Sequence, residues 1–155
     1  MPKVLISDAM DSIAENLLKE NEIEVDVKIN LNQQELINII PDYNGLIVRS
    51  ATKVTKETIE AANNLKIIGR AGAGVDNIDL KAASDKKIIV MNTPGGNTNA
   101  TAEHTLALLF SLIRKIPEAN NGTHEGLWEK KKLKGSELRG KTIGIIGFGN
   151  VGKRF

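Results

Sequence analysis

Short runs of apolar residues alternate with amphipathic segments through most of the chain. Five runs rich in Val, Ile and Leu predict strands at residues 3–7, 23–29, 45–49, 65–69 and 88–91. The segments between them place apolar residues at helical spacing and predict helices at residues 12–20, 32–40, 55–64 and 79–86. Strand and helix alternate about every ten residues, which is typical of an α/β fold with a parallel sheet and crossover helices.

Polar residues and a proline mark the expected ends of these helices. Ser12, Asn32 and Thr55 precede helical runs and are candidate N-cap residues. Pro41 is expected to end the second helix, because proline has no N–H group to donate to the preceding turn.

The pattern changes after the fifth predicted strand. Residues 92–99 form a polar, turn-rich loop that is typical of a hinge or a domain boundary. A long helix then runs from Ala100 to Ile116, stopped by Pro117, with apolar residues over most of its circumference. Such a helix is expected to be buried between two layers or at a contact between subunits. Residues 119–140 are polar, and we expect them to run over the surface.

The C-terminal segment carries a glycine motif directly after an apolar run. Residues 142–146 predict a buried parallel strand, and the residues after the motif predict the start of a helix. The motif G-x-G-x-x-G consists of Gly147, Gly149 and Gly152. In a dinucleotide-binding fold these glycines make a tight turn, let the backbone approach the pyrophosphate, and let the helix pack on the strand. Glycine-rich turns are common, so the motif alone also fits an ordinary turn.

Composition narrows the classes of function. The chain has 155 residues, of which 41% are hydrophobic and 26% charged, and its net charge of +2 gives no case for binding nucleic acid or membranes. There is no cysteine, which excludes disulfides, thiolate metal sites and a cysteine nucleophile. The longest apolar run, residues 105–113, is far short of the roughly 20 residues that a membrane span needs. No signal peptide is visible, and we expect a cytoplasmic protein.

Three loops follow predicted strands at the edge of the sheet where ligands of open α/β folds bind. Residues 49–53 offer an arginine and hydroxyls to a phosphate or carboxylate, or else a solvated arginine at a strand end. Residues 70–77 place two glycines around an alanine, which indicates an anion-binding nest or a tight turn. Residues 92–99 present Asn97 to a polar ligand, or form a linker.

The two histidines give weak evidence for catalysis. His104 lies on the long apolar helix, where we expect a packed, hydrogen-bonded side chain rather than a base. His124 lies in the polar segment without a partner at ligand spacing, and we expect it to be solvated. The sequence shows no metal-binding motif and no catalytic triad.

Several of these motifs occur together in a characteristic order. They are Val48–Val54, Gly69–Asn77, Val90–Pro94, Ala102–Glu103, Trp128–Lys131, Glu137–Thr142 and Gly147–Gly152. The set resembles the D-2-hydroxyacid dehydrogenase family over nearly the whole chain, but covers only the N-terminal part of such an enzyme. The resemblance implies a flavodoxin-like parallel-sheet substrate domain at residues 1–98. Residues 99–155 would then be the start of a Rossmann nucleotide-binding domain, its first helix and strand, ending after the glycine loop.

The resemblance also assigns roles to single residues. Arg49, Ser50 and Asn97 would contact the substrate, and Gly72 and Ala73 would offer backbone N–H groups to its carboxylate. Members of the family often have threonine where Ala73 stands, and alanine offers no side-chain hydrogen bond to the cofactor there. Lys130 matches a basic position that reaches the phosphate of the neighbouring subunit's substrate. The residues implied to contact the cofactor NAD are Ala73, Gly147, Gly149, Asn150, Val151 and Gly152.

The resemblance further implies what lies outside the chain. The catalytic arginine, carboxylate and histidine of the family would all follow Phe155, so we expect no catalytic residue within this chain and no activity from it alone. The implied substrate is a small phosphorylated 2-hydroxy acid, favoured by residues 49–53 and the lysines after Trp128. The implied assembly is a homodimer or tetramer through residues 100–116 and 119–140. Two alternatives stay open: another 2-hydroxyacid dehydrogenase, and a non-catalytic protein that binds anions or pairs with other subunits.

Overall fold

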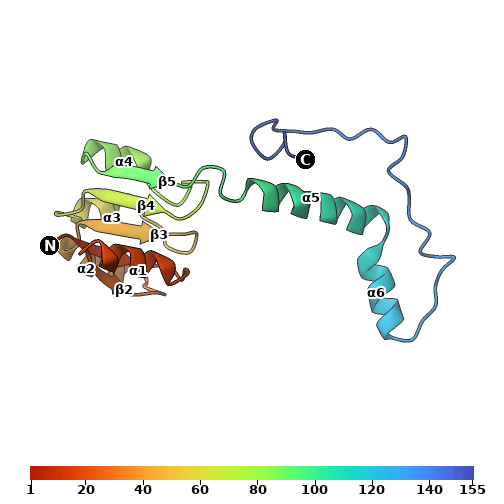
Figure 1. Ribbon diagram of the computed structural model, residues 1–155, viewed down its shortest axis with the longest axis horizontal. Helices are drawn as coiled ribbons and strands as arrows, with labels where there is room; N and C mark the ends of the chain where they lie inside the picture. Colours follow the sequence, from red (N-terminus) through yellow and green to blue (C-terminus); the bar gives the residue numbers. More distant parts are fainter. The chain divides into compact units, whose positions relative to one another are not determined.

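A parallel sheet organises the first part of the chain. The computed structural model describes residues 1–155, which form two compact units, Met1–Gly96 and Asn97–Phe155 (Figure 1). The first unit holds five parallel strands in the order β2-β1-β3-β4-β5. They are β1 (Lys3–Ile6), β2 (Glu24–Val27), β3 (Gly45–Val48), β4 (Ile67–Arg70) and β5 (Ile89–Asn92). This strand order is that of the flavodoxin-like doubly wound fold, which confirms the fold class that the sequence predicted.

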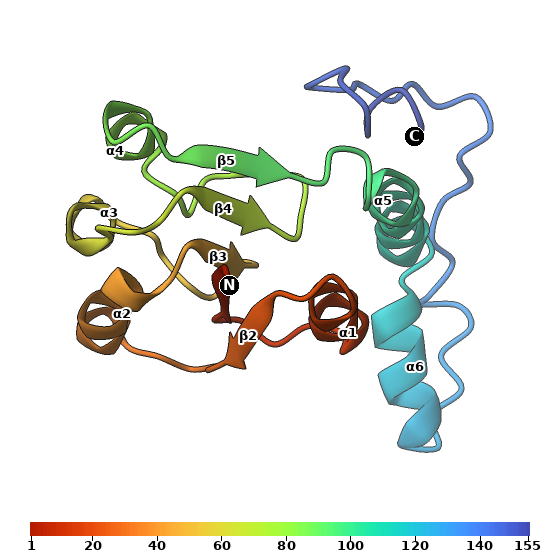
Figure 2. The same ribbon diagram turned by 60° about the vertical axis from the view of Figure 1, so that its left-hand side comes forward.

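Helices cover the two faces of this sheet unequally. They are α1 (Ile13–Glu20), α2 (Gln33–Ile39), the short 3-10 helix η1 (Ile40–Asp42), α3 (Lys56–Ala61) and α4 (Leu80–Asp85). In Figure 2, α2, α3 and α4 lie on one face, and α1 lies on the other.

The core of this unit forms between the sheet and α2, α3 and α4. Side chains alternate between the faces of a strand, so Leu5, Leu46 and Ile68 point to these helices and are fully buried. On the opposite face, Ile67 and its partner Ile89 in the neighbouring strand are exposed. The connected core cluster therefore lies on one side of the sheet, while the other face buries Val4 and Ile6 of β1.

The helix ends show which local signals decided the boundaries. Asn32 caps α2 in a capping box: its side chain accepts from the Glu35 N–H at 3.0 Å, and Glu35 accepts from the Asn32 N–H at 2.8 Å. Thr55 caps α3, as predicted. Ser12 occupies the N-cap position of α1, as predicted, but its side chain makes no capping hydrogen bond; the carboxylate of Asp11 accepts the N–H of Ile13 instead, at 2.9 Å.

The second unit contains two helices where the sequence predicted one helix and a surface segment. α5 (Thr98–Ile113) is followed by α6 (Ile116–His124). Pro117 lies in the first turn of α6, where its missing N–H has no helical partner to lose, so it begins a helix rather than only ending one. Lys115 makes the corner between the helices with a φ of 54°.

The apolar surface of α5 is not covered within the chain. Ala102 is its only buried residue, and Leu112 is 77% exposed. The prediction that this helix is buried between two layers is therefore wrong for the chain itself. Burial at a contact between subunits stays a prediction.

The predicted strand at residues 142–146 does not form in this chain. Ile145 is 44% exposed and Ile146 fully exposed, and no strand pairs with the segment. A single strand cannot satisfy its own N–H and C=O groups, so it needs a neighbour before it can form. The predicted helix start is likewise replaced by turns, in which the N–H of Lys153 donates to the Gly149 carbonyl at 3.1 Å.

Candidate functional site

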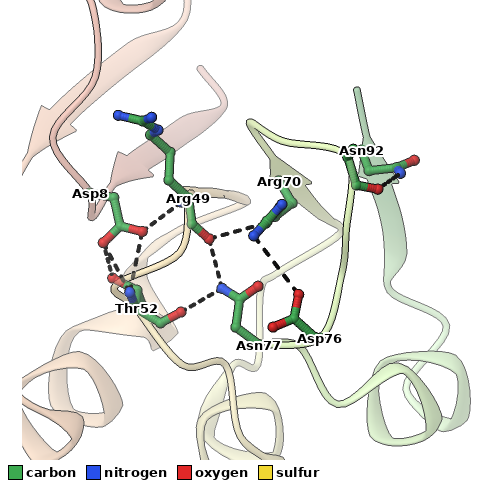
Figure 3. A network of polar contacts seen from close by, with 8 residues as sticks. Asp8, Arg49, Thr52, Arg70, Asp76, Asn77 and Asn92 are labelled. Carbon is green, nitrogen blue, oxygen red and sulfur yellow. Dashed lines mark hydrogen bonds and ion pairs between the residues drawn. The ribbon is translucent and has the colours of Figure 1, made fainter. Parts of the chain in front are cut away.

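Four polar segments meet at the carboxyl edge of the sheet. They are Asp8 after β1, residues 49–52 after β3, residues 70–77 after β4, and Asn92 at the end of β5. In parallel strands these ends share one edge, which is where open α/β folds bind ligands. Figure 3 shows the polar contacts that join them.

Asp8 holds the loop after β3 through its carboxylate. The side chain accepts the N–H of Arg49 at 2.5 Å, the N–H of Thr52 at 3.0 Å, and the hydroxyl of Thr52 at 2.6 Å. The residue is only 5% exposed. Buried carboxylates are tolerated when hydrogen-bond donors surround them, and here the loop itself supplies these donors.

Asn77 holds the same loop from the other side. Its amide nitrogen donates to the carbonyl of Arg49 at 2.8 Å and to the carbonyl of Thr52 at 2.7 Å. The amide oxygen of Asn77 is buried and has no hydrogen-bond partner. The side chain therefore uses its donor group fully and leaves its acceptor unpaired.

Arg70 packs beneath the glycine-containing loop that it begins. Its Nε donates to the Arg49 carbonyl at 3.3 Å, and its guanidinium lies 3.9 Å from the carboxylate of Asp76. A Cβ atom at Gly72 would lie 2.3 Å from the guanidinium Nη1 of Arg70. In this arrangement the absence of a side chain at position 72 leaves room for the guanidinium of Arg70, and a larger residue would have to displace that flexible side chain.

The backbone of this loop is only partly available to a ligand. The N–H of Gly72 donates to the Arg70 carbonyl at 2.8 Å, so this predicted donor is engaged within the chain. The N–H of Ala73 makes no hydrogen bond in the chain, while the Ala73 carbonyl accepts from the side chain of Asn92 at 2.7 Å. Of the two predicted backbone donors, Ala73 is the one that can meet an anion without rearrangement.

A cavity of about 390 Å³ lies between the ends of β1 and β3 and the loop before α2. Its lining includes Asp8, Ala9, Asn30, Arg49, Ser50 and Thr52. The guanidinium of Arg49 reaches across to the carbonyl of Ala9, at 3.1 Å. The oxygens of the Asp8 carboxylate are occupied by three donors of the loop, whereas the Arg49 guanidinium still has N–H groups to donate to a ligand. The cavity suits a small anion.

The remaining predicted site residues belong to the second unit. Asn97 precedes α5, and Lys130 and Asn150 are exposed. Gly147 adopts a φ of 95°, which favours glycine, and a Cβ at Gly152 would lie 2.3 Å from the Gly147 carbonyl. Nothing lies within 4 Å of a Cβ placed at Gly149. The loop conformation thus requires two of the three glycines, and the third leaves open space over the backbone.

The histidines take no part in this network. His104 is exposed on α5, so the expected packed and hydrogen-bonded side chain is not found. His124 is exposed at the end of α6, as predicted. No three side chains gather as a metal site, and none of the helices is long and apolar enough to cross a membrane.

Sequence reasoning missed the residues that hold the loops together. Asp8 directly follows a predicted strand, so its position at the ligand-binding edge was available from the sequence. Asn77 lies in the loop at residues 70–77, whose glycines indicated an anion-binding nest or a tight turn. What the sequence could not provide was the contact itself, since 41 residues separate Asp8 from Arg49 along the chain.

This fold, with an anion-suited cavity at its carboxyl edge and a glycine motif further along the chain, defines the class of protein. The chain belongs to the D-isomer specific 2-hydroxyacid dehydrogenase family, whose catalytic-domain model matches residues 4–148.

Three relatives show which members of the family this chain is similar to. A D-3-phosphoglycerate dehydrogenase of Archaeoglobus fulgidus is 53% identical over 150 residues, covering 97% of this chain and 28% of the relative. A hydroxypyruvate reductase of Thermotoga maritima is 49% identical over 152 residues, covering 97% of this chain and 49% of the relative. The NAD+-bound 3-phosphoglycerate dehydrogenase of Entamoeba histolytica matches with a TM-score of 0.79 at 37% identity, covering 99% of this chain and 48% of that one. The chain thus spans about half or less of the length of these relatives.

Proposed function

We propose that the chain is the N-terminal part of an NAD-dependent D-3-phosphoglycerate dehydrogenase. This enzyme oxidises 3-phosphoglycerate to 3-phosphohydroxypyruvate, a step of L-serine biosynthesis. The observation that carries the proposal is the cavity beside Arg49, whose guanidinium is the one positively charged group in its lining and which is large enough for a small phosphorylated acid. Identity of 53% to a D-3-phosphoglycerate dehydrogenase supports the choice of substrate.

The residues of the first unit bind and orient this substrate. The guanidinium of Arg49 and the hydroxyl of Ser50 pair with an anionic group, because an arginine offers a planar fork of donors to a phosphate or carboxylate. The backbone N–H of Ala73 is a second donor at the same edge. Gly72 has no side chain and therefore leaves room for the guanidinium of Arg70 beneath the loop. Asn97 and Lys130 complete the contacts in the whole enzyme, the latter on a neighbouring subunit's substrate.

The cofactor NAD fits the glycine loop of the second unit. The open space over Gly149 lets backbone approach a pyrophosphate, and Asn150 and Val151 offer N–H groups beside it. When bound, NAD accepts the hydride that leaves the substrate. The chain's own contribution, from Gly147, Gly149, Asn150, Val151, Gly152 and Ala73, is to hold it. The arginine, carboxylate and histidine that act on the substrate hydroxyl belong to the rest of the enzyme.

The assembly and the location of the protein are part of the proposal. The exposed apolar side chains of α5 favour a homodimer or tetramer, in which residues 100–116 and 119–140 meet a second copy. A cytoplasmic location remains a prediction from the sequence.

One alternative within the family has its own support. The 49% identity to a hydroxypyruvate reductase favours a substrate without phosphate. Lys130 and Lys131 favour the phosphorylated substrate, because their positive charges attract a phosphate more strongly than an uncharged group, whereas the neighbouring Lys132 is already paired with Glu129.

The test is a substrate comparison with the complete reading frame that contains this chain. We expect its purified product to reduce NAD with 3-phosphoglycerate, with a kcat/KM at least about tenfold above that for glycerate or lactate, because a phosphate paired with arginine is a strong contact. The 155-residue chain alone is expected to be inactive. A preference for an unphosphorylated acid would favour the alternative, and lack of dehydrogenase activity from the complete product would contradict the proposal. In that case a non-catalytic anion-binding or pairing role is the one to test.

A further inference from the structure

The loop at residues 49–52 is held at the same two residues from two sides. Asp8 accepts the N–H groups of Arg49 and Thr52, and Asn77 donates to the C=O groups of Arg49 and Thr52 (Figure 3). Both ends of the loop are thus fixed through both of their backbone polar groups. We call this arrangement the Asp8–Asn77 clamp.

We propose that Asp8 and Asn77 are positioning residues that fix the loop at residues 49–52 in its anion-binding geometry. The inference rests on the proposed function, since the anion is the substrate of that reaction. Neither side chain needs to touch the substrate to act in this way. Each acts through Arg49 and Ser50, which do.

The clamp determines which groups of the loop are left for a ligand. Ser50 and Ala51 lie between the two fixed residues, are exposed, and donate no backbone hydrogen bond within the chain. The side chain of Arg49 extends from one fixed end into the cavity, where it contacts the Ala9 carbonyl at 3.1 Å. A loop whose ends are fixed presents these groups in one arrangement, which lowers the entropy lost when a ligand binds.

The clamp also weakens an electrostatic conflict. Asp8 lines the same cavity as Arg49, and a free carboxylate there would repel an anionic substrate. The three hydrogen bonds that the carboxylate accepts come from Arg49 and Thr52, so its charge is directed into the loop. The loop is held by a negative charge, yet the Arg49 guanidinium and the N–H groups of Ser50 and Ala51 stay available to the ligand.

Asn77 is specific for this task because its two donors are both used. An aspartate at position 77 would have the same size but would direct carboxylate oxygens at two carbonyl oxygens. The neighbouring contact from Arg70 Nε to the Arg49 carbonyl, at 3.3 Å, would remain in that variant. A weaker binding of substrate in Asn77→Asp would therefore come from the loss of the two hydrogen bonds that the Asn77 amide donates.

The experiment compares Asn77→Ala and Asn77→Asp with a matched control in the complete enzyme. The control is Asn64→Ala, because the side chain of Asn64 also donates to a backbone carbonyl, that of Pro41 at 2.8 Å, but lies before β4 at the other end of the sheet. We expect both position-77 variants to raise the KM for 3-phosphoglycerate about tenfold or more, with the KM for NAD changed less than about twofold. The control is expected to keep the wild-type KM values.

A purely structural role predicts a different result. It would lower kcat through the loss of folded enzyme and leave the KM for 3-phosphoglycerate unchanged, and that outcome would overturn the inference. An equal rise of KM in Asn64→Ala would overturn it too. Asp8→Asn, which turns one accepting oxygen into a donor that faces loop N–H groups, is expected to repeat the KM effect.

A second measurement separates this inference from the proposed function. In the wild-type 155-residue chain, titration with inorganic phosphate is expected to shift the amide NMR signals of Ser50 and Ala51, and Asn77→Asp is expected to abolish these shifts. If the complete enzyme ignores 3-phosphoglycerate but the shifts behave in this way, the substrate assignment fails and the positioning role stands. If the enzyme oxidises 3-phosphoglycerate while neither the KM nor the shifts respond to Asn77→Asp, the positioning role fails alone.

Discussion

Outside the candidate site, Tyr43 forms a partly buried hydrogen bond to a charged side chain. Its hydroxyl donates to the carboxylate of Asp26 at 2.6 Å, and the same carboxylate lies 3.1 Å from the ammonium of Lys3. The hydrogen bond from Tyr43, and then that from Lys3, lowers the pKa of Asp26. Burial and the hydrogen bond to Asp26 raise the pKa of Tyr43 to about 12. The pair is therefore most stable with Asp26 ionised and Tyr43 neutral.

This arrangement predicts a pH-dependent effect of Tyr43→Phe. A carboxyl group whose pKa is lowered by folding adds stability above its unfolded pKa, near 4, and that stability is lost as the pH falls through the folded value. We expect Tyr43→Phe to reduce the free energy of unfolding by about 1 kcal/mol at pH 7, and by less below about pH 3. Urea unfolding at both pH values measures this. An equal loss at both would show that the effect comes from packing and not from the charged hydrogen bond.

At the residue scale the sequence predicted the residues of the candidate site, but not the residues that hold its loops in place. The strand pattern placed Arg49, Ser50, Gly72 and Ala73 at one edge of the sheet, because parallel strands end together. The close approach of the Arg70 guanidinium to Gly72 is visible only in the tertiary structure. The same is true of Asp8, whose role depends on a loop 41 residues away.

Helices and strands formed where the local sequence pattern favoured them and a neighbouring group was present to pair with them. Asn32 and Glu35 have the spacing of a capping box, and both of its hydrogen bonds are present. Residues 142–146 have a strong strand pattern but no neighbouring strand, and they remain unpaired. Ser12 had the right chemistry for a cap, but Asp11 is the residue whose side chain makes the hydrogen bond. Local pattern alone therefore predicts helices more reliably than it predicts their caps or an isolated strand.

The two candidate caps give a matched pair of substitutions. Asn32→Ala is expected to lower the free energy of unfolding by about 1 kcal/mol, because it leaves the Glu35 N–H without its acceptor. Ser12→Ala is expected to change it by less than about 0.5 kcal/mol, since its side chain makes no capping hydrogen bond. Thermal or urea unfolding of both variants measures the difference. Equal losses would mean that capping does not control the stability of α2.

At the scale of the whole molecule, the two units differ in how many of their apolar side chains are buried. The core cluster runs from Leu5 to Ile88 and lies entirely in the first unit. In α5 only Ala102 is buried, and Leu108, Phe110 and Leu112 are exposed. The stability of the chain is therefore expected to reside in residues 1–96.

Truncation tests this distribution of stability. We expect a chain of residues 1–96 to unfold cooperatively, with a midpoint within about 5 °C of that of the 155-residue chain, since the loss of exposed residues removes little buried area. Residues 97–155 alone are expected to show no cooperative transition. Circular dichroism during heating reports both results. A truncated first unit without a cooperative transition would show that its fold depends on the second unit.

The sequence by itself determined the alternation of strands and helices, the parallel sheet and the edge at which the candidate site lies. These follow from residue periodicity and chain order, which are local properties. The tertiary structure decided which apolar segments find a partner: Ile68 is buried beneath helices, while Ile146 is fully exposed because no strand lies beside it. It also decided that Asp8 and Asn77 meet at one loop, because their contacts join residues from 25 to 44 positions apart. Contacts over such distances depend on how the strands are ordered in the sheet, and no local pattern encodes them.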